Sequence, residues 1–453
     1  MPRLVLRWML PCALIVFAAP FLCVSFYSSP AADDFCKASL SFNMVPQPSV
    51  MAVTWLYYTQ WSPRWLTTFL ESLVMSQANL GAAYGWLLSA VMLANVASLG
   101  YFFLAVFGFP RSTALLAAGV FYAAWVASIV NPDEQLYWLT GSMEYNLSLC
   151  TMLVLAGLLF RPRRTAWYYA LIVLLSIAVP AQHEIAGIVI CAILLAGTII
   201  LGMKRIPARE WRLGLGAATL SLAAVMLSPG TVARAAVERK QLWDTAHSLR
   251  WVAHAFYNGF NWLANPAILL AACCIALLAQ TTGKPGALRN APKWLGLALL
   301  GAMTILLCAV ALVEIATGAW APPRVVAWFQ FVFWMLFVCV ILTGVPEVFQ
   351  FRFSEGTRTG VFALFAVMLL GSAHFRAALG DLRGPAQSWH GIGLFRLAQH
   401  GGSLEFAAPA QFPKLAKPQM LTEDPGCWVN RCLANYLHAD TVVVRNSTDT
   451  CPH

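Results

Sequence analysis

The residues able to do chemistry are a small set of acids, histidines and arginines that lie between long apolar stretches. The first candidates are the adjacent carboxylates Asp33 and Asp34, which follow an apolar run at about residues 4–27. A positioned carboxylate can accept the proton of an attacking hydroxyl, so this pair is a candidate general base. The alternative is that the pair caps a helix and adds solubilising charge.

A second candidate segment, residues 131–146, combines acids with aromatic rings and contains no Lys or Arg. Carboxylates accept hydrogen bonds from sugar hydroxyls, and aromatic rings stack on the apolar face of a sugar. The alternative is an aromatic belt at the membrane surface with ordinary loop acids. The segment predicts a substrate-binding role for four of its residues: Glu134, Trp138, Glu144 and Tyr145.

A third candidate is the pair His183 and Glu184, in a turn of four residues (181–184) between two apolar runs. The turn is so short that both side chains lie at or just below the membrane surface, where ionisable groups are costly and often functional. We expect them to bind substrate, and a salt bridge at the membrane edge is the alternative. No HxxH or HExxH spacing follows, so the sequence does not indicate a zinc site.

Two arginines each follow a helix-ending Pro motif. Arg234 comes after Ser228-Pro229-Gly230, and Arg324 comes directly after Pro322-Pro323. A guanidinium matches a phosphate through two parallel hydrogen bonds, so both are candidate ligands of an anionic lipid headgroup. Snorkelling to ordinary phospholipid is the alternative.

Composition dictates the elements that position these residues. Of the 453 residues, 60% are hydrophobic and 11% are charged, which excludes a soluble enzyme and a disordered chain. An apolar helix of about 20 residues crosses a bilayer. The sequence therefore predicts an all-α polytopic membrane protein with about eleven transmembrane helices, at about 4–27, 82–108, 112–130, 145–160, 165–180, 185–202, 211–227, 260–280, 294–316, 325–343 and 359–375.

Basic residues predict the orientation. Every second loop is short and rich in Lys and Arg, whereas loops 131–144 and 181–184 contain neither, so the positive-inside rule places the N-terminus in the cytoplasm and the C-terminus outside. The net charge of +10 is then an orientation signal, and no nucleic-acid partner is expected. The predicted cytoplasmic basic residues are Arg3, Arg7, Arg111, Arg161, Arg163, Arg164, Lys204, Arg205, Arg209, Arg212, Lys284, Arg289, Lys293, Arg352 and Arg358.

This topology divides the chain into a membrane module, residues 1–375, and an extracytoplasmic C-terminal region, residues 376–453. The module's outer loops are 28–80, 131–144, 181–184, 228–259 and 317–324. Within the first loop, residues 64–77 are predicted to form an amphipathic helix on the membrane surface. Four outward cysteines allow three disulfide connectivities, which the sequence leaves open: Cys36, Cys427, Cys432 and Cys451.

Taken in chain order, several motifs resemble those of bacterial GT-C-type integral-membrane glycosyltransferases, near the O-antigen-modifying glucosyltransferases. They are Asp-Asp-Phe at 33–35, Trp-Ser-x-Arg at 61–64, Trp-x-x-Gly-x-x-x-Tyr at 138–145, His-Glu at 183–184, Ser-Pro-Gly-x-x-x-Arg at 228–234, Pro-Pro-Arg at 322–324 and Trp-x-Asn-x-Cys at 428–432. The resemblance implies a GT-C-like fold with juxtamembrane helices in the first outer loop. It also implies a bacterial inner-membrane enzyme that moves a sugar from a polyprenyl-phosphate donor to an extracytoplasmic glycan or lipid acceptor.

In this family an acidic residue of the first outer loop acts as the general base or binds the acceptor, and the resemblance implies this role for Asp33 and Asp34. The leaving phosphate needs cations, which we assign to Lys37, Arg234 and Arg324, with Arg64 at the substrate. No cofactor is predicted, and a divalent metal is not indicated because Asp33-Asp34 is not an Asp-x-Asp motif. Two other functions remain open: a lipid or glycan transporter or flippase, and a non-catalytic membrane scaffold.

Overall fold

The computed structural model describes residues 2–77, 80–160, 165–238, 245–280, 293–317, 321–344, 353–383, 402–407, 414–415, 420–445 and 451. This part of the chain is mostly helical, as predicted, with two small two-stranded sheets. Each predicted apolar run coincides with a helix: α1 (Pro2–Ser25), α5 (Leu80–Phe107), α6 (Arg111–Val126), α7 (Leu139–Leu159), α8 (Ala166–Gln182), α9 (Glu184–Met203), α10 (Arg209–Met226), α13 (Pro266–Gln280), α14 (Lys293–Thr317), α15 (Pro323–Gly344) and α16 (Glu355–Leu370).

Within the described residues, five helical segments are long and apolar enough to cross a membrane, or up to seven if two bent helix pairs each count as one span. The five segments are Trp8–Ser25, Ala82–Phe107, Leu139–Leu159, Glu184–Met203 and Pro323–Thr343. Several other helices are apolar but short, such as α6 and α8. A membrane protein is therefore indicated, whereas the count of eleven spans stays a prediction.

The predicted span at 260–280 contains a break. Helix α12 (Thr245–Ala264) and α13 meet at an angle of 51°. Pro266 cannot donate the hydrogen bond that would continue α12, and the Asn265 Oδ1 atom accepts the Ala267 backbone N–H at 2.9 Å, which starts α13 afresh. A second bent pair joins α16 to α17 (Ala373–Arg383) at 47°.

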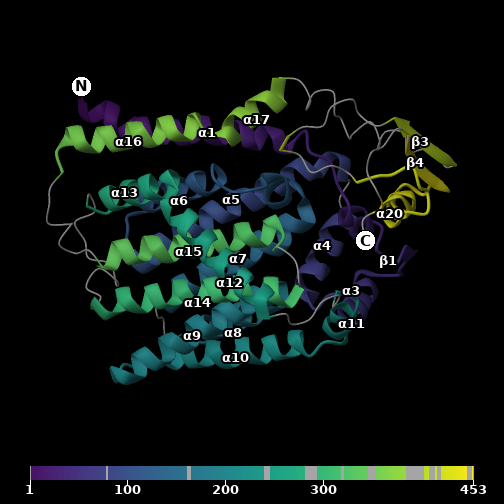
Figure 1. The fold of residues 1–453 in the computed structure, drawn as a ribbon, viewed down its shortest axis with the longest axis horizontal. Coiled ribbons are helices and arrows are strands. Elements are labelled where there is room, and N and C mark those ends of the chain that lie inside the picture. Colours follow the sequence, from purple (N-terminus) through teal and green to yellow (C-terminus); the bar gives the residue numbers. More distant parts are fainter. Residues whose placement is uncertain are drawn as a thin grey trace.

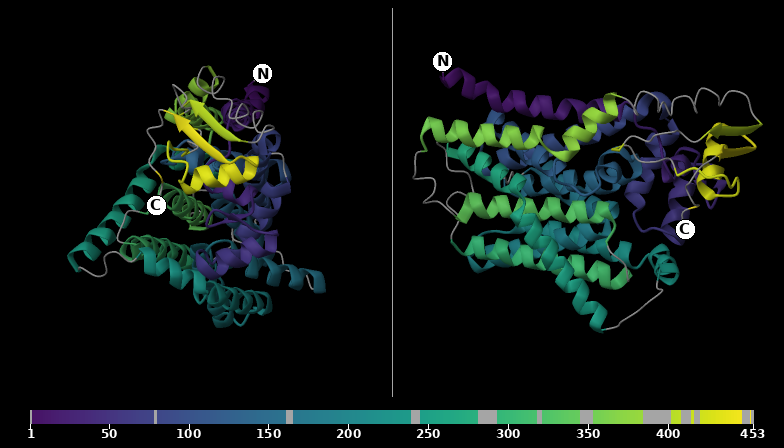
Figure 2. Two further views of the ribbon diagram at one scale, coloured as in Figure 1. Left: turned by 90° about the vertical axis from the view of Figure 1, so that its right-hand side faces the viewer. Right: turned by 45° about the horizontal axis from the view of Figure 1, so that its top comes forward.

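The long helices run side by side along one axis, and most of the remaining elements gather at one end of this bundle (Figure 1). The N-terminus lies at the opposite end. Two views from other directions show the C-terminal elements over the same end (Figure 2). The gathered elements are α2 (Asp33–Ala38), α3 (Val50–Gln60), α4 (Trp65–Gln77), α11 (Pro229–Glu238), α20 (Trp428–Leu437), β1 (Ser41–Phe42), β2 (Val45–Pro46), β3 (Ser403–Ala407) and β4 (Thr441–Arg445).

The first outer loop and the C-terminal region thus share one end of the bundle, as the predicted topology requires. Which end faces the cytoplasm stays a prediction. Part of the basic pattern lies outside the described residues, namely Arg161, Arg163, Arg164, Lys284, Arg289 and Arg352. Parts of the predicted loops 228–259 and 317–324 and of the region 376–453 also lie outside them.

Helix α4 forms within the predicted range, buries one polar face against the protein and exposes Leu73. An exposed apolar side chain is compatible with contact to lipid, so the predicted position of α4 on the membrane surface stays a prediction. The buried face supplies polar groups to the end of the bundle: Thr67, Thr68, Glu71 and Ser72.

Candidate functional site

Asp34 is a structural carboxylate that caps the N-terminus of α7 from a distant part of the chain. Its side chain is fully buried and accepts four hydrogen bonds. The Asp34 Oδ1 atom accepts the backbone N–H (2.9 Å) and the hydroxyl (2.7 Å) of Thr140, and Oδ2 accepts the Ala31 N–H (3.1 Å) and the Tyr84 hydroxyl (2.7 Å). A negative charge at a helix N-terminus is favourable. This distant cap explains why α7 begins at Leu139, six residues before the predicted run.

Asp33, the neighbouring carboxylate, is half-buried and differs from Asp34 in its bonding. No described residue donates a hydrogen bond to its carboxylate or forms an ion pair with it. Burial raises the pKa of Asp33 to about 6; the charges of Lys37 and Arg324 lower it, and those of Glu144 and Asp34 raise it. Of the two predicted bases, Asp33 is therefore the one whose oxygens have no bonding partner among the described residues and whose pKa lies close to neutral pH.

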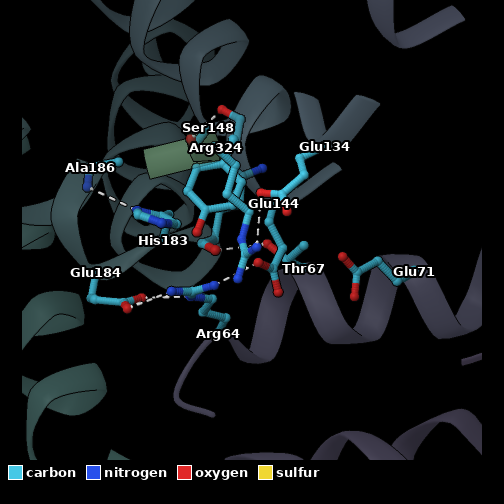
Figure 3. Close-up of polar contacts among 12 residues, drawn as sticks. Arg64, Thr67, Glu71, Glu134, Glu144, Ser148, His183, Glu184, Ala186 and Arg324 are labelled. Atoms are coloured by element: carbon cyan, nitrogen blue, oxygen red, sulfur yellow. Dashed lines mark hydrogen bonds and ion pairs between the residues drawn. The ribbon is translucent and has the colours of Figure 1, made fainter. Parts of the chain in front are cut away.

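Arg64, at the start of α4, joins two other predicted residues (Figure 3). Its Nε and Nη2 atoms donate to the two carboxylate oxygens of Glu184, both at 2.7 Å, and its Nη1 atom donates to Glu144 at 2.6 Å. The side chains of Arg64, Glu144 and Glu184 are 10%, 17% and 24% exposed, so the pairs are poorly screened by water. Arg64 therefore joins α4, α7 and α9, and these two carboxylates take up three of its donors. We call this arrangement the Arg64 clamp.

Arg324, the first-turn residue of α15, lies against the segment before α7. Its Nη1 atom pairs with Glu134 at 3.1 Å, and its guanidinium lies 5.3 Å from the centre of the Trp138 ring. The Trp138 indole N–H donates to the Ala31 carbonyl at 3.2 Å, which fixes the ring beside α2. Arg324 keeps 28% of its side chain exposed, so it is the most accessible cation of these ion pairs.

Lys37 lies inside the protein rather than at a surface. Its ammonium is 3.3 Å from a Glu71 oxygen and 3.8 Å from the centre of the Tyr57 ring, and Glu71 is fully buried. Neither Glu71 oxygen has a hydrogen-bond partner among the described residues, and burial raises the pKa of Glu71 while Lys37 opposes that shift. The predicted phosphate ligand is therefore already engaged with an acid that the sequence did not single out.

Glu134 belongs to a π-helical turn, η1 (Asp133–Tyr137), that the sequence did not predict. Such wide turns are rare and are frequently found at functional sites. A buried amide pair holds this one, because Gln135 Nε2 donates to Asn146 Oδ1 and Asn146 Nδ2 donates to the Gln135 carbonyl, both at 2.8 Å. Gly141 lets η1 approach α7, since a Cβ atom there would lie 2.5 Å from the Glu134 carbonyl oxygen.

Gly141→Ala is expected to push η1 away from α7 and to lower the free energy of unfolding by about 1–3 kcal/mol, the cost of an overpacked methyl group. Unfolding in detergent measures this. Gly216→Ala in α10 is the matched control, because nothing lies within 4 Å of a Cβ there, and alanine is the better helix former. Equal stability of the two variants would contradict the role assigned to Gly141.

His183 is the single residue between α8 and α9 and is fully buried. Its Nδ1 atom accepts the Ala186 backbone N–H at 3.5 Å, whereas Nε2 has no partner among the described residues. Burial, helped by the charge of Arg64, lowers the pKa of His183 to about 4. The imidazole is therefore neutral at pH 7, with its proton on Nε2, packed between the rings of Tyr145 and Trp328.

The remaining predicted residues lie at the edges of the site. Arg234 is half-buried on α11, 5.8 Å from the Trp61 ring, and its charge reaches His183. Tyr145 and Trp138 are buried, and their rings contact His183 and Arg324 respectively. Their faces are therefore covered, and they pack the site rather than offering a free platform for a sugar.

The predicted residues thus come from six segments and meet at one end of the bundle. Sequence reasoning missed Glu71, Tyr84 and Thr140, which hold Lys37 and Asp34. One signal was available for Glu71: it interrupts an otherwise uncharged helix on a face of small hydroxyl residues. Within the described part of the chain, no group of three or more His, Cys, Asp or Glu side chains is placed to hold a metal ion.

Fold and site together define a helical membrane protein with a charged site at one end of its bundle. No protein-family model, curated protein or solved structure matches the chain. The GT-C resemblance therefore rests on the order of its motifs.

Proposed function

We propose that this chain is a membrane glycosyltransferase that moves a sugar from a polyprenyl-phosphate donor to a hydroxyl of an extracytoplasmic glycan or lipid. One observation carries the proposal: Asp33 is a half-buried carboxylate without a bonding partner among the described residues, close enough to Arg324 to feel its charge. A base beside a cation is what transfer from a phosphate to a hydroxyl requires.

In the proposed reaction, the acceptor oxygen attacks the anomeric carbon as Asp33 takes the hydroxyl proton. The new carbon–oxygen bond forms while the bond from that carbon to the phosphate oxygen breaks, which inverts the anomeric centre. The electron pair of the broken bond leaves with the polyprenyl phosphate. A phosphate is already a good leaving group, so it needs cations to stabilise its charge rather than a general acid.

Arg324 is the foremost cation for the donor phosphate, because it is partly exposed and lies near Asp33. Arg234 is a second candidate from the other side of the site. Lys37 is bound to a buried acid and Arg64 to two partly buried ones, so we assign both to holding the site together. The neutral His183 is fully buried between two rings, so we assign it to packing the site.

Transfer at saturating donor is expected to depend on pH through Asp33. Only the deprotonated carboxylate accepts a proton, so the rate should rise about tenfold per pH unit below pH 6 and level off above about pH 7. The measurement is the initial rate of sugar transfer in membranes supplied with polyprenyl-phosphate-linked hexoses. A rate that does not change between about pH 5 and about pH 8 would refute a base with this pKa.

A transporter or flippase is the second candidate, and one observation favours it. Transporters often contain broken helices, and two bent helix pairs occur here, one of them interrupted at Asn265-Pro266. The charged groups of the candidate site, however, gather at one end of the bundle rather than at these breaks. A lipid-linked sugar that crosses a vesicle membrane intact, with no sugar transferred, would favour transport.

A further inference from the structure

Helix α2 carries Asp33 but is too short to hold its own position. It has six residues, and isolated helices of this length are not stable. The residue before it, Ala32, has a φ angle of 45°, in the left-handed region that alanine disfavours. The position of Asp33 must therefore be imposed by whatever packs around α2.

The C-terminal region supplies much of that packing. Cys36 of α2 forms a disulfide with Cys432 of α20, which joins residues 396 positions apart. Phe35, fully buried, belongs to the same apolar cluster as Val429, Leu433 and Val442. The core of this region is thus built around α2, although the sequence suggested a separate region.

The other side of α2 faces the candidate site. Asp34 bonds to Thr140 of α7, and Lys37 pairs with Glu71 of α4. Within one short helix, Phe35 and Cys36 are therefore held by the C-terminal region, while Asp33, Asp34 and Lys37 are directed to the site. A displacement of α20 would be passed directly to the proposed base.

We propose that the C-terminal region is a positioning element of the site, and that the Cys36–Cys432 disulfide is the link by which it holds Asp33 in place. The effect on catalysis rests on the proposed glycosyl transfer; the effect on α2 does not. Such a link forms in an oxidising compartment and opens under reducing conditions. Arg324 lies on α15 and belongs to neither disulfide-bonded segment.

The chain contains its own control. A second disulfide, Cys427–Cys451, lies wholly within the C-terminal region and includes no residue of α2. Replacing its two cysteines by serine also removes one disulfide from the C-terminal region but leaves the link to α2 intact. The comparison therefore separates loss of the link from general damage to the C-terminal region.

The test compares the double variants C36S/C432S and C427S/C451S with the unaltered protein in membranes. The first readout is labelling of the Lys37 amine by a water-soluble amine reagent, followed by mass spectrometry. Lys37 is 4% exposed, so it should be protected in the unaltered protein and in C427S/C451S, and label at least about tenfold faster in C36S/C432S. Equal protection of Lys37 in all three proteins would overturn the proposal.

The second readout is sugar transfer. C36S/C432S should lower kcat at least about tenfold because the base is displaced, with a smaller effect on the KM for the donor because Arg324 is held from α15. A raised KM with unchanged kcat would contradict the positioning role. If Lys37 becomes reactive in C36S/C432S but membranes with the unaltered protein transfer no sugar, the proposed function fails and the positioning inference stands.

A third measurement covers the case in which C36S/C432S does not fold. In the C427S/C451S protein, a water-soluble thiol reductant opens only the Cys36–Cys432 disulfide after folding is complete. Lys37 should then become reactive, and reoxidation should restore its protection. Continued protection after confirmed reduction would overturn the proposal.

Discussion

Asp33→Asn is expected to lower the rate of sugar transfer by about 10²–10⁴-fold, the usual contribution of a positioned general base. The amide has nearly the same shape but cannot accept the hydroxyl proton. The variant should fold at least as well as the unaltered protein, since it removes a half-buried charge whose burial is unfavourable at pH 7. The measurements are initial transfer rates and thermal unfolding in detergent.

Asp34→Asn is the matched control, one residue away in the same helix. Its carboxylate accepts four hydrogen bonds, and an amide would place donors against donors. We expect the free energy of unfolding to fall by about 3 kcal/mol or more, with any loss of activity following the loss of folded protein. Full activity of Asp33→Asn would remove Asp33 from the mechanism.

Arg64→Ala is expected to give the largest loss of stability of any single change at the site. It removes three hydrogen bonds and leaves the carboxylates of Glu144 and Glu184 without their guanidinium. Breaking a buried ion pair by removing one partner costs about 3–5 kcal/mol, because the other charge stays buried and unpaired. Unfolding of the purified protein in mixed micelles, followed by circular dichroism, measures this loss.

Arg64→Lys serves as the control for charge. A lysine keeps the positive charge but cannot reach two carboxylates with the geometry of the guanidinium, so it should recover only part of the stability. Replacing Glu144 and Glu184 by Gln together with Arg64→Ala should recover more, since no buried charge is left unpaired. An Arg64→Ala protein as stable as the unaltered one would show that the clamp is not structural.

The sequence predicted the helices well because the length of an apolar run is a local property. All eleven runs coincide with helices, yet the ends differ where distant residues act. The early start of α7 depends on Asp34, more than a hundred residues away. The buried polar face of α4 includes Glu71, whose partner Lys37 comes from another helix. Glu71 stands out as the single charge of its helix, but the identity of its partner leaves no mark in the local sequence.

The proximity of the candidate residues was predicted better than the contacts that each of them makes. Scarce ionisable groups in short loops at one side of a bundle had to lie near one another, and they do. A salt bridge at Glu184 was one of the two alternatives, but which acid binds which cation depends on side-chain geometry, so the partners of Arg64 and Lys37 could not be named. The cysteines illustrate the same limit, because three pairings were open and the fold selects Cys36–Cys432 and Cys427–Cys451.

The central claim is tested most directly by following the sugar itself. Purified protein in liposomes receives a polyprenyl-phosphate hexose with a radiolabelled sugar, together with a panel of glycan and lipid acceptors. The account predicts that the label moves to an acceptor with inverted anomeric configuration, and that Asp33→Asn abolishes this movement. A label that stays on the polyprenyl phosphate with every donor and acceptor, whether or not the lipid crosses the membrane, would contradict it.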